Sequence, residues 1–166
     1  MLHRHIELRH IVKRMSSDSI IVPTYKKAVL QAVAYKRLRE VANRELKPFN
    51  LNTTQWLILG VLHGEPGGHK VSAIAYTLQV EVPLITTLSH PLLMSGFITQ
   101  SYDEQDKRSK PLTITEEGSR LMELIEARLV GPLQQLEVGM DHTEVNQYVR
   151  TLERLIANAE TMTVAD

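Results

Sequence analysis

Few side chains in this chain of 166 residues could do chemistry, and they are scattered. His63 and His69 lie six positions apart across a turn rich in glycine, and together with Glu65 they could coordinate a metal ion. Metal ligands need convergent geometry, and turns of this composition more often carry exposed histidines. We therefore expect no metal site.

Catalytic motifs are also missing from the sequence. It contains no phosphate-binding loop, no His-Glu-x-x-His motif and no nucleophile elbow. The nearest approach to a catalytic carboxylate pair is Glu116-Glu117 or Glu123 with Glu126, which we interpret as helix N-terminal acids and a solvated face. The absence of cysteine excludes thiol nucleophiles and thiolate metal sites. We expect a protein that is not an enzyme and has no cofactor.

Residues 95–118 instead predict a β-hairpin with a charged tip. Phe97 to Gln100 and Pro111 to Thr115 are rich in β-branched or aromatic residues, as strands are. The ten residues between them, 101–110, have no aliphatic side chain. Such an arm, preceded by helices and followed by a long helix, is the layout of a winged helix, and we call residues 95–115 the wing.

Helices are predicted before the wing. Thr24 is a plausible N-cap of a helix that Pro48 ends, and Tyr25 and Val29 lie on its apolar face. A second helix begins after Asn52, which can cap it while Gln55 bonds back to the cap. A third, short helix covers about 72–78.

A fourth helix starts with Pro83 in its first turn, where the missing N–H costs nothing. Its apolar residues follow a helical spacing and face the core: Ile85, Leu88 and Leu92. The polar residues between them are then left towards solvent or a ligand: Thr86, Thr87, Ser89 and His90. Residues 82–95 contain no Lys, Arg, Asp or Glu.

Two helices are predicted after the wing. Thr115 can cap the first of them, and the pair Gly131-Pro132 should kink or break it. The second starts near Asp141 or Thr143. Its broad apolar face needs a partner, for which a second subunit is the economical choice: Val145, Tyr148, Val149, Leu152, Leu155, Ile156 and Ala159.

The net charge of zero conceals an uneven distribution. Residues 1–47 hold eleven Lys or Arg against four Asp or Glu, whereas residues 48–166 hold eight against fifteen. No apolar run approaches the roughly 18 residues of a membrane span, and charges interrupt any N-terminal signal segment. We therefore expect a cytoplasmic protein with no membrane partner.

Three segments in order resemble the MarR family of winged-helix transcription regulators. They are Leu51-Asn52-Thr53-Thr54-Gln55 with the apolar run after it, then Ile74-Ala75 with the residues up to Phe97-Ile98, and Asp106-Lys107-Arg108 followed by Ile114-Thr115 and Gly118. The resemblance implies a mainly α fold with a small β-hairpin wing. The implied fold comprises a winged helix-turn-helix unit (48–118), N- and C-terminal dimerisation helices (24–47 and 119–166), and a basic arm or extra helix (1–22).

The resemblance also implies roles for individual residues on double-stranded DNA. Arg108 would enter the minor groove, Asp106 would hold the wing by pairing with an arginine, and Lys107 and Lys110 would meet phosphates. Exposed residues of the third and fourth helices would lie in or beside the major groove: Ser72, Thr86, Thr87 and His90.

The same resemblance implies a pocket for a small aromatic effector between the dimerisation helices and the DNA-reading unit. Its candidate lining residues are the following, most of which we interpret as plain core rather than pocket: Tyr35, Trp56, Tyr76 and Met122. The function expected is a homodimeric regulator on a pseudo-palindromic operator, released by an effector. The alternative is a winged-helix protein-interaction module with weak or no operator reading, suggested by the uncharged segment 82–95.

Overall fold

The computed structural model describes residues 22–65, 67–101 and 110–163. It divides into two units, Met1–Glu40 and Val41–Asp166, with the boundary inside a helix. The basic arm predicted over 1–22 lies outside the described residues except for Val22, and the predicted functional division of the chain stays a prediction.

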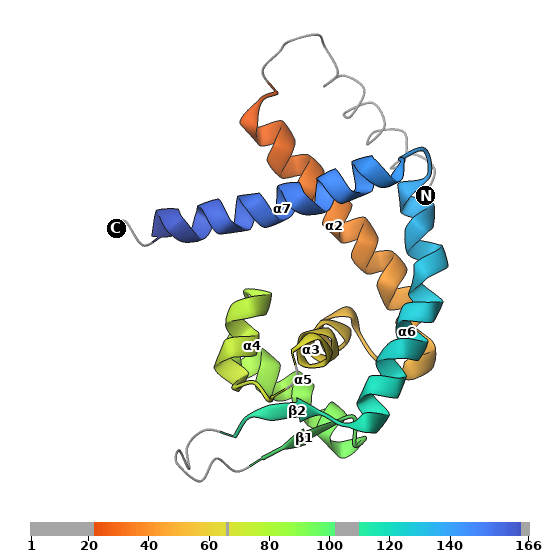
Figure 1. Cartoon of the computed structure of the whole chain (residues 1–166), viewed down its shortest axis with the longest axis vertical. Coiled ribbons are helices and arrows are strands. Elements are labelled where there is room, and N and C mark those ends of the chain that lie inside the picture. Colours follow the sequence, from red (N-terminus) through yellow and green to blue (C-terminus); the bar gives the residue numbers. More distant parts are fainter. Residues whose placement is uncertain (1–21, 66, 102–109, 164–166) are drawn as a thin grey trace. The chain divides into compact units, whose positions relative to one another are not determined.

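The described part of the first unit is the N-terminal portion of α2 (Thr24–Leu46) (Figure 1). The helix includes Thr24 rather than being capped by it, because the carbonyl of Pro23 already accepts a hydrogen bond from the Lys26 N–H at 3.0 Å. Tyr25 is 64% exposed and Val29 is 43% exposed. The predicted apolar face is therefore uncovered in this portion of the helix.

The second unit begins with the buried end of α2, where Ala42 and Leu46 join the core. A 3-10 turn, η1 (Lys47–Phe49), contains Pro48, the predicted stop. The next helix, α3 (Thr53–Gly64), starts with the predicted capping box: Asn52 accepts from the Gln55 N–H at 2.9 Å, and the Gln55 side chain accepts from the Asn52 N–H at 3.1 Å. This prediction is confirmed.

Two further helices, α4 (Val71–Leu78) and α5 (Val82–Met94), pack against α3 and against each other (Figure 1). The turn between them uses Gln79 in the left-handed region, at φ 53°. The core residues predicted for α5 are confirmed, since Ile85 and Leu92 are buried and Leu88 packs on the core. The helix continues through Pro91.

The wing is a two-stranded antiparallel sheet of β1 (Ile98–Gln100) and β2 (Leu112–Ile114), with Ile98 opposite Ile114. The predicted hairpin is thus confirmed, and its tip, 102–109, lies outside the described residues. His69, just before α4, extends the ladder by exchanging two 2.8 Å backbone hydrogen bonds with Leu112. The wing is therefore tied to the helix-turn-helix unit.

After the wing come α6 (Glu116–Gln134), a 3-10 turn η2 (Gln135–Glu137) and α7 (His142–Thr163). A kink or break was predicted at Gly131-Pro132; the break is wrong, because α6 continues through Pro132, and the kink stays a prediction. That proline lies two residues before the end of the helix, so the hydrogen bond that it cannot donate interrupts only the last turn. Asp141 caps α7, accepting from the Glu144 N–H at 2.8 Å while the Glu144 carboxylate accepts from the Asp141 N–H.

Within the described ranges, no single helix is long and apolar enough to cross a membrane; only α4 and α5 taken together, bent by 112°, reach the required length and composition. Both helices contribute buried residues to the core, among them Ile74 and Ile85.

Candidate nucleic-acid interface

The exposed face of α5 carries three of the predicted DNA-binding residues, Thr86, Thr87 and His90. Both threonine hydroxyls donate to carbonyls one turn earlier in the helix: Thr86 to Val82 O at 3.2 Å and Thr87 to Pro83 O at 2.9 Å. Each hydroxyl keeps acceptor capacity on its outer side. A ligand on this face therefore meets methyl groups and hydroxyl lone pairs.

Ser89, expected to face solvent or a ligand, is instead only 2% exposed. It lies four residues after Ile85 and three before Leu92, so it shares the buried stripe of the helix. Its hydroxyl has no hydrogen-bond partner among the described residues. The helical spacing alone could have revealed this burial.

Gln55 ties α5 to the start of α3. Beyond its part in the capping box, its side-chain amide donates to the carbonyl of Leu88 at 3.3 Å, and the residue is 6% exposed. The sequence identified the local cap but not this second contact, which joins residues 33 positions apart. Gln55 thereby fixes α5 against α3.

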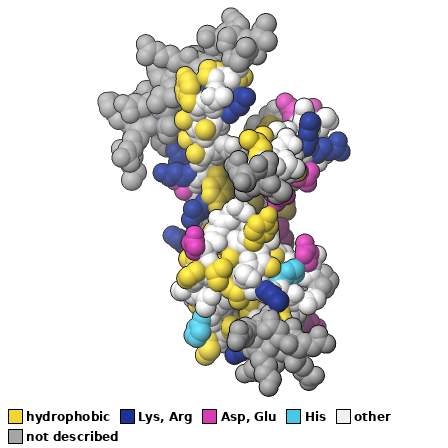
Figure 2. Space-filling view, turned by 90° about the vertical axis from the view of Figure 1, so that its left-hand side faces the viewer, with side chains coloured by type: hydrophobic (Ala, Val, Ile, Leu, Met, Phe, Trp, Pro, Cys, Tyr) yellow, Lys and Arg dark blue, Asp and Glu magenta, His cyan; other side chains and the backbone are white. Residues whose placement is uncertain are grey.

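The surface around α5 is poor in charge. Neither α4 nor α5 contains a Lys, Arg, Asp or Glu residue. Ser72 lies exposed in the first turn of α4, as a DNA contact there requires. In the lower part of Figure 2, hydrophobic (yellow) and white surface predominates, with a few charged side chains and histidines among it. Phosphate-binding groups must therefore come from other elements.

The base of the wing is closed by hydrogen bonds across its two strands. Ser101 N–H donates to Pro111 O at 3.1 Å, and the Gln100 side chain donates to Lys110 O at 3.3 Å. Lys110 is exposed at this base. Asp106, Lys107 and Arg108 lie outside the described residues, so their predicted roles stay predictions.

Thr115 and Gly118 join the wing to α6. The Thr115 hydroxyl donates to Gly96 O at 2.6 Å and accepts from the Gly118 N–H at 3.0 Å. The Thr115 N–H donates to Phe97 O at 3.0 Å. A Cβ on Gly118 would come within 2.0 Å of that same Phe97 oxygen, so only glycine fits here. This pair fixes the direction in which α6 leaves the wing.

A second joint connects α6 to the end of α2. Arg128 donates to Glu45 O at 3.0 Å and lies 3.2 Å from the Glu45 carboxylate, which also accepts from Arg44 at 2.9 Å. The hydrogen bond from Arg44 lowers the pKa of the Glu45 carboxyl; burial opposes this, and the charge of Arg128 adds to the lowering. No local pattern predicted this contact, since its partners lie 83 positions apart.

The MarR family model matches residues 51–110, a segment that runs from the cap of α3 into the wing. This match covers most of the winged-helix unit. Solved structures similar to the whole chain have the same fold. One is a MarR-family transcriptional regulator from Rhodococcus sp. RHA1, 23% identical, with a TM-score of 0.75, covering 84% of this chain and 96% of its own.

Two other similar structures contain bound molecules. S. aureus MepR, in complex with DNA, is 23% identical, with a TM-score of 0.67 over 79% of this chain and 96% of that chain. CouR from Rhodococcus jostii RHA1, bound to p-coumaroyl-CoA, is 24% identical, with a TM-score of 0.69 over 76% and 88%. At these identities the likeness establishes the MarR winged-helix fold.

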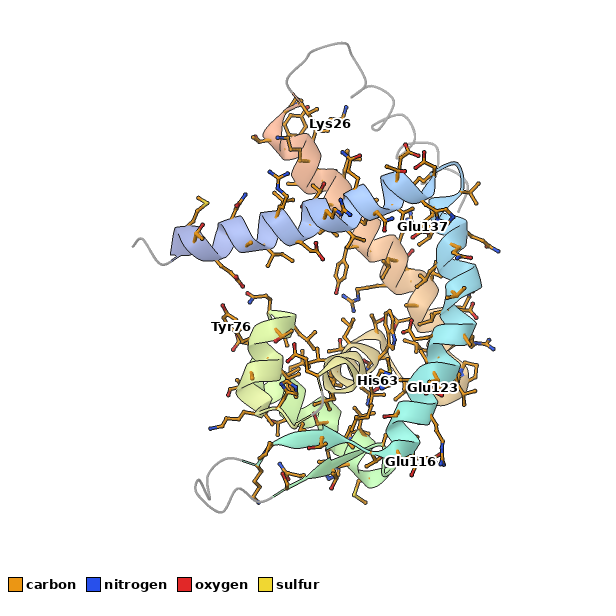
Figure 3. All side chains as sticks on the ribbon, viewed as in Figure 1. Lys26, His63, Tyr76, Glu116, Glu123 and Glu137 are labelled. Carbon is orange, nitrogen blue, oxygen red and sulfur yellow. The ribbon has the colours of Figure 1, made fainter. Side chains whose placement is uncertain are left out.

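The residues predicted to line an effector pocket lie in different surroundings. In the MarR-type unit, Met122 is buried in the core and Trp56 packs against the same core, donating from its indole to Glu126 at 3.0 Å. Tyr76 is 66% exposed, on the side of α4 away from α3 (Figure 3). Tyr35 belongs to the first unit, where Arg39 lies over its ring at 5.7 Å. The pocket stays a prediction.

The remaining polar candidates in the MarR-type unit have structural partners. The ring of His69 bonds to the Glu65 carbonyl at 3.0 Å, and no cluster of three metal-ligating side chains occurs among the residues the structure covers. Glu116 and Glu117 pair with Arg120 in the first turns of α6 (Figure 3). The interpretation of these acids as a helix N-terminus and solvated face is confirmed.

Proposed function

We propose that the protein is a homodimeric cytoplasmic transcription regulator that binds pseudo-palindromic duplex DNA. The observation that carries the proposal is the exposed face of α5, with Thr86, Thr87 and His90, on a unit that matches the MarR family. A helix of this kind fits the major groove, and a dimer places two of them about one DNA turn apart. The DNA complex of the similar MepR supports this reading.

The dimer is supported by an uncovered apolar face on α7. Tyr148 is 52% exposed, Leu155 is 52% exposed and Ile156 is 61% exposed. In the first unit, Tyr25 and Val29 of α2 are also uncovered. Apolar faces of this extent are stabilised by a partner, and a second copy supplies matching helices.

Affinity for phosphates comes from the N-terminal third and from the wing. Residues 1–47 carry eleven of the 19 Lys and Arg residues, and the wing adds Lys107, Arg108 and Lys110. Arg108 would enter the minor groove, with Asp106 holding its loop. Each phosphate contact contributes about 0.9 to the salt slope of binding to duplex DNA.

The regulator is released from DNA when a small aromatic ligand binds more tightly to the dimer geometry that does not fit DNA than to the one that does. The bound p-coumaroyl-CoA of the similar CouR supports an effector of aromatic character. Within the second unit, the side chains we propose for its site are Trp56, Tyr76 and Met122.

Titration of promoter-sized duplexes at several salt concentrations tests the proposal. Specific duplexes should bind at least about a thousandfold more tightly than random ones, and Arg108→Ala should weaken binding. Equal affinity for all duplexes, or full binding by Arg108→Ala, would contradict it. A matched control is Arg150→Ala, which removes an exposed charge from α7.

A second candidate function is a protein-interaction module. It is favoured by the uncharged α4 and α5 surface, where Leu84 is 42% exposed and Met94 is 76% exposed. Leu93, in contrast, packs against the protein's own core. If the protein binds all duplexes with equal affinity, and Leu84→Ser abolishes association with another regulator in co-purification, this second function replaces the first.

A further inference from the structure

The N-terminal half of α5 presents a surface that is apolar for a helix expected to read DNA. Val82 is 44% exposed and Leu84 is 42% exposed. The helix has no charged side chain over its whole length. The two exposed polar residues of this half are Thr86 and Thr87.

In the structure those two threonines direct their hydroxyl hydrogens to the helix backbone. A hydroxyl has one hydrogen, and both hydrogens are used within the helix, in the bonds to Val82 O and Pro83 O. What remains outward is the methyl group of each threonine and the lone pairs of its oxygen. On the helix Val82 neighbours Thr86 at i, i+4, and Leu84 neighbours Thr87 at i, i+3. We call the exposed side of α5 that these two pairs flank the methyl face.

The chemistry of base edges decides what such a face can recognise. Guanine presents two acceptors in the major groove and needs a donor, which the methyl face lacks. Thymine presents a C5-methyl group, for which apolar side chains and threonine methyls are suitable partners. His90, further along α5, is the nearest residue on the helix whose ring could bond to a base edge or phosphate.

We propose that the methyl face selects operators by packing against thymine C5-methyl groups in the major groove. This inference rests on the proposed function, since it names what the DNA-reading helix reads. Glu81 is the N-cap of α5, and its carboxylate directly precedes the methyl face in the sequence. Its carboxylate disfavours nearby phosphate, so the face gains affinity from base contact rather than from the backbone.

Uracil substitution isolates the proposed contact. Duplexes are first selected from a random library with the full-length protein, and single thymines of the best site are then replaced by uracil, which removes only the C5-methyl. Replacing one contacted thymine by uracil should lower the affinity for DNA about fourfold, which is the effect of losing one buried methyl-sized group. Uracil at positions outside the two half-sites is the control, and minor-groove contacts by the wing do not sense this change.

Two variants of one residue separate methyl from hydroxyl reading. Thr87→Val keeps the methyl and removes the hydroxyl, whereas Thr87→Ser does the reverse. The proposal predicts that Thr87→Val retains affinity, while Thr87→Ser loses about fourfold and becomes insensitive to uracil at one position. Thr151→Ser is the matched control, because Thr151 on α7 is also exposed and donates to a carbonyl one turn earlier, Gln147 O, at 2.7 Å.

The outcomes distinguish this inference from the proposed function. A selected operator whose affinity is unchanged by every uracil substitution overturns methyl reading and leaves the regulator intact. Loss of binding in Thr87→Val with retention in Thr87→Ser also overturns it. Failure to select any sequence over random duplex overturns both.

Discussion

Replacing Gly118 with alanine should separate the wing from α6. The new Cβ would lie 2.0 Å from the Phe97 carbonyl oxygen and 2.8 Å from the Ile114 side chain. Close-packed interiors do not contain such approaches, so the start of α6 has to move by about 1 Å or more. The backbone oxygen cannot rotate away, because it accepts the Thr115 N–H.

The expected loss of stability follows from two contributions. Forcing an extra methyl into a packed site costs roughly 1–3 kcal/mol. Displacing Thr115 also weakens its bonds to Phe97 O and Gly96 O, at about 1 kcal/mol each. The free energy of unfolding should therefore fall by roughly 3–5 kcal/mol.

Urea unfolding followed by circular dichroism, at equal protein concentrations, measures this loss. Gly60→Ala is the matched control, because the same change in α3 meets only Met122 Cε at an ordinary 3.9 Å. That variant should gain up to about 1 kcal/mol from helix propensity. If Gly118→Ala is as stable as the original protein, or shifts in the same direction as Gly60→Ala, the steric reasoning is refuted.

Three other predictions concern the joints and the dimer. In Glu45→Gln the stability lost relative to the original protein should be largest at neutral pH. It should decline as pH falls from the unfolded glutamate pKa of about 4.3 through the lower folded pKa, because a carboxyl with a lowered folded pKa stabilises fully only above its unfolded pKa. Urea midpoints across pH check this, and a constant difference contradicts it. Asn43→Ala should cost about 1–3 kcal/mol in urea unfolding, since the N–H and hydroxyl of buried Thr53 lose their acceptor; an unchanged midpoint would mean that water replaces Asn43. Ile156→Glu should shift the mass in sedimentation from two chains to one, because it places a charge on the α7 apolar face; a persistent dimer would place the interface elsewhere.

Local physics made much of the fold predictable from the sequence. The capping box of Asn52 and Gln55 involves residues three positions apart, and so does the Thr115 cap. The hairpin followed from β-branched runs on either side of a polar loop. The family resemblance rested on these same local features, and the match over 51–110 covers the part where they are densest.

Some expectations failed where the surroundings outweighed a local signal. Pro132 was expected to disrupt α6, yet it lies close enough to the helix end that few hydrogen bonds follow it. Ser89 was expected to face solvent because it is polar, but it lies on the buried face of α5 with Ile85 and Leu92. Its small side chain fits that position.

By itself, the sequence determined the order and type of the elements, because caps, prolines and apolar periodicity act over a few residues. Only the tertiary structure decided how the elements are joined: Gln55 to Leu88, Arg128 to Glu45, and Gly118 against Phe97. These contacts join residues far apart in the chain, or depend on the space left by a missing Cβ. Neither kind of contact produces a periodic or local pattern in the sequence. The partners and distances of these contacts are therefore known only from the folded structure.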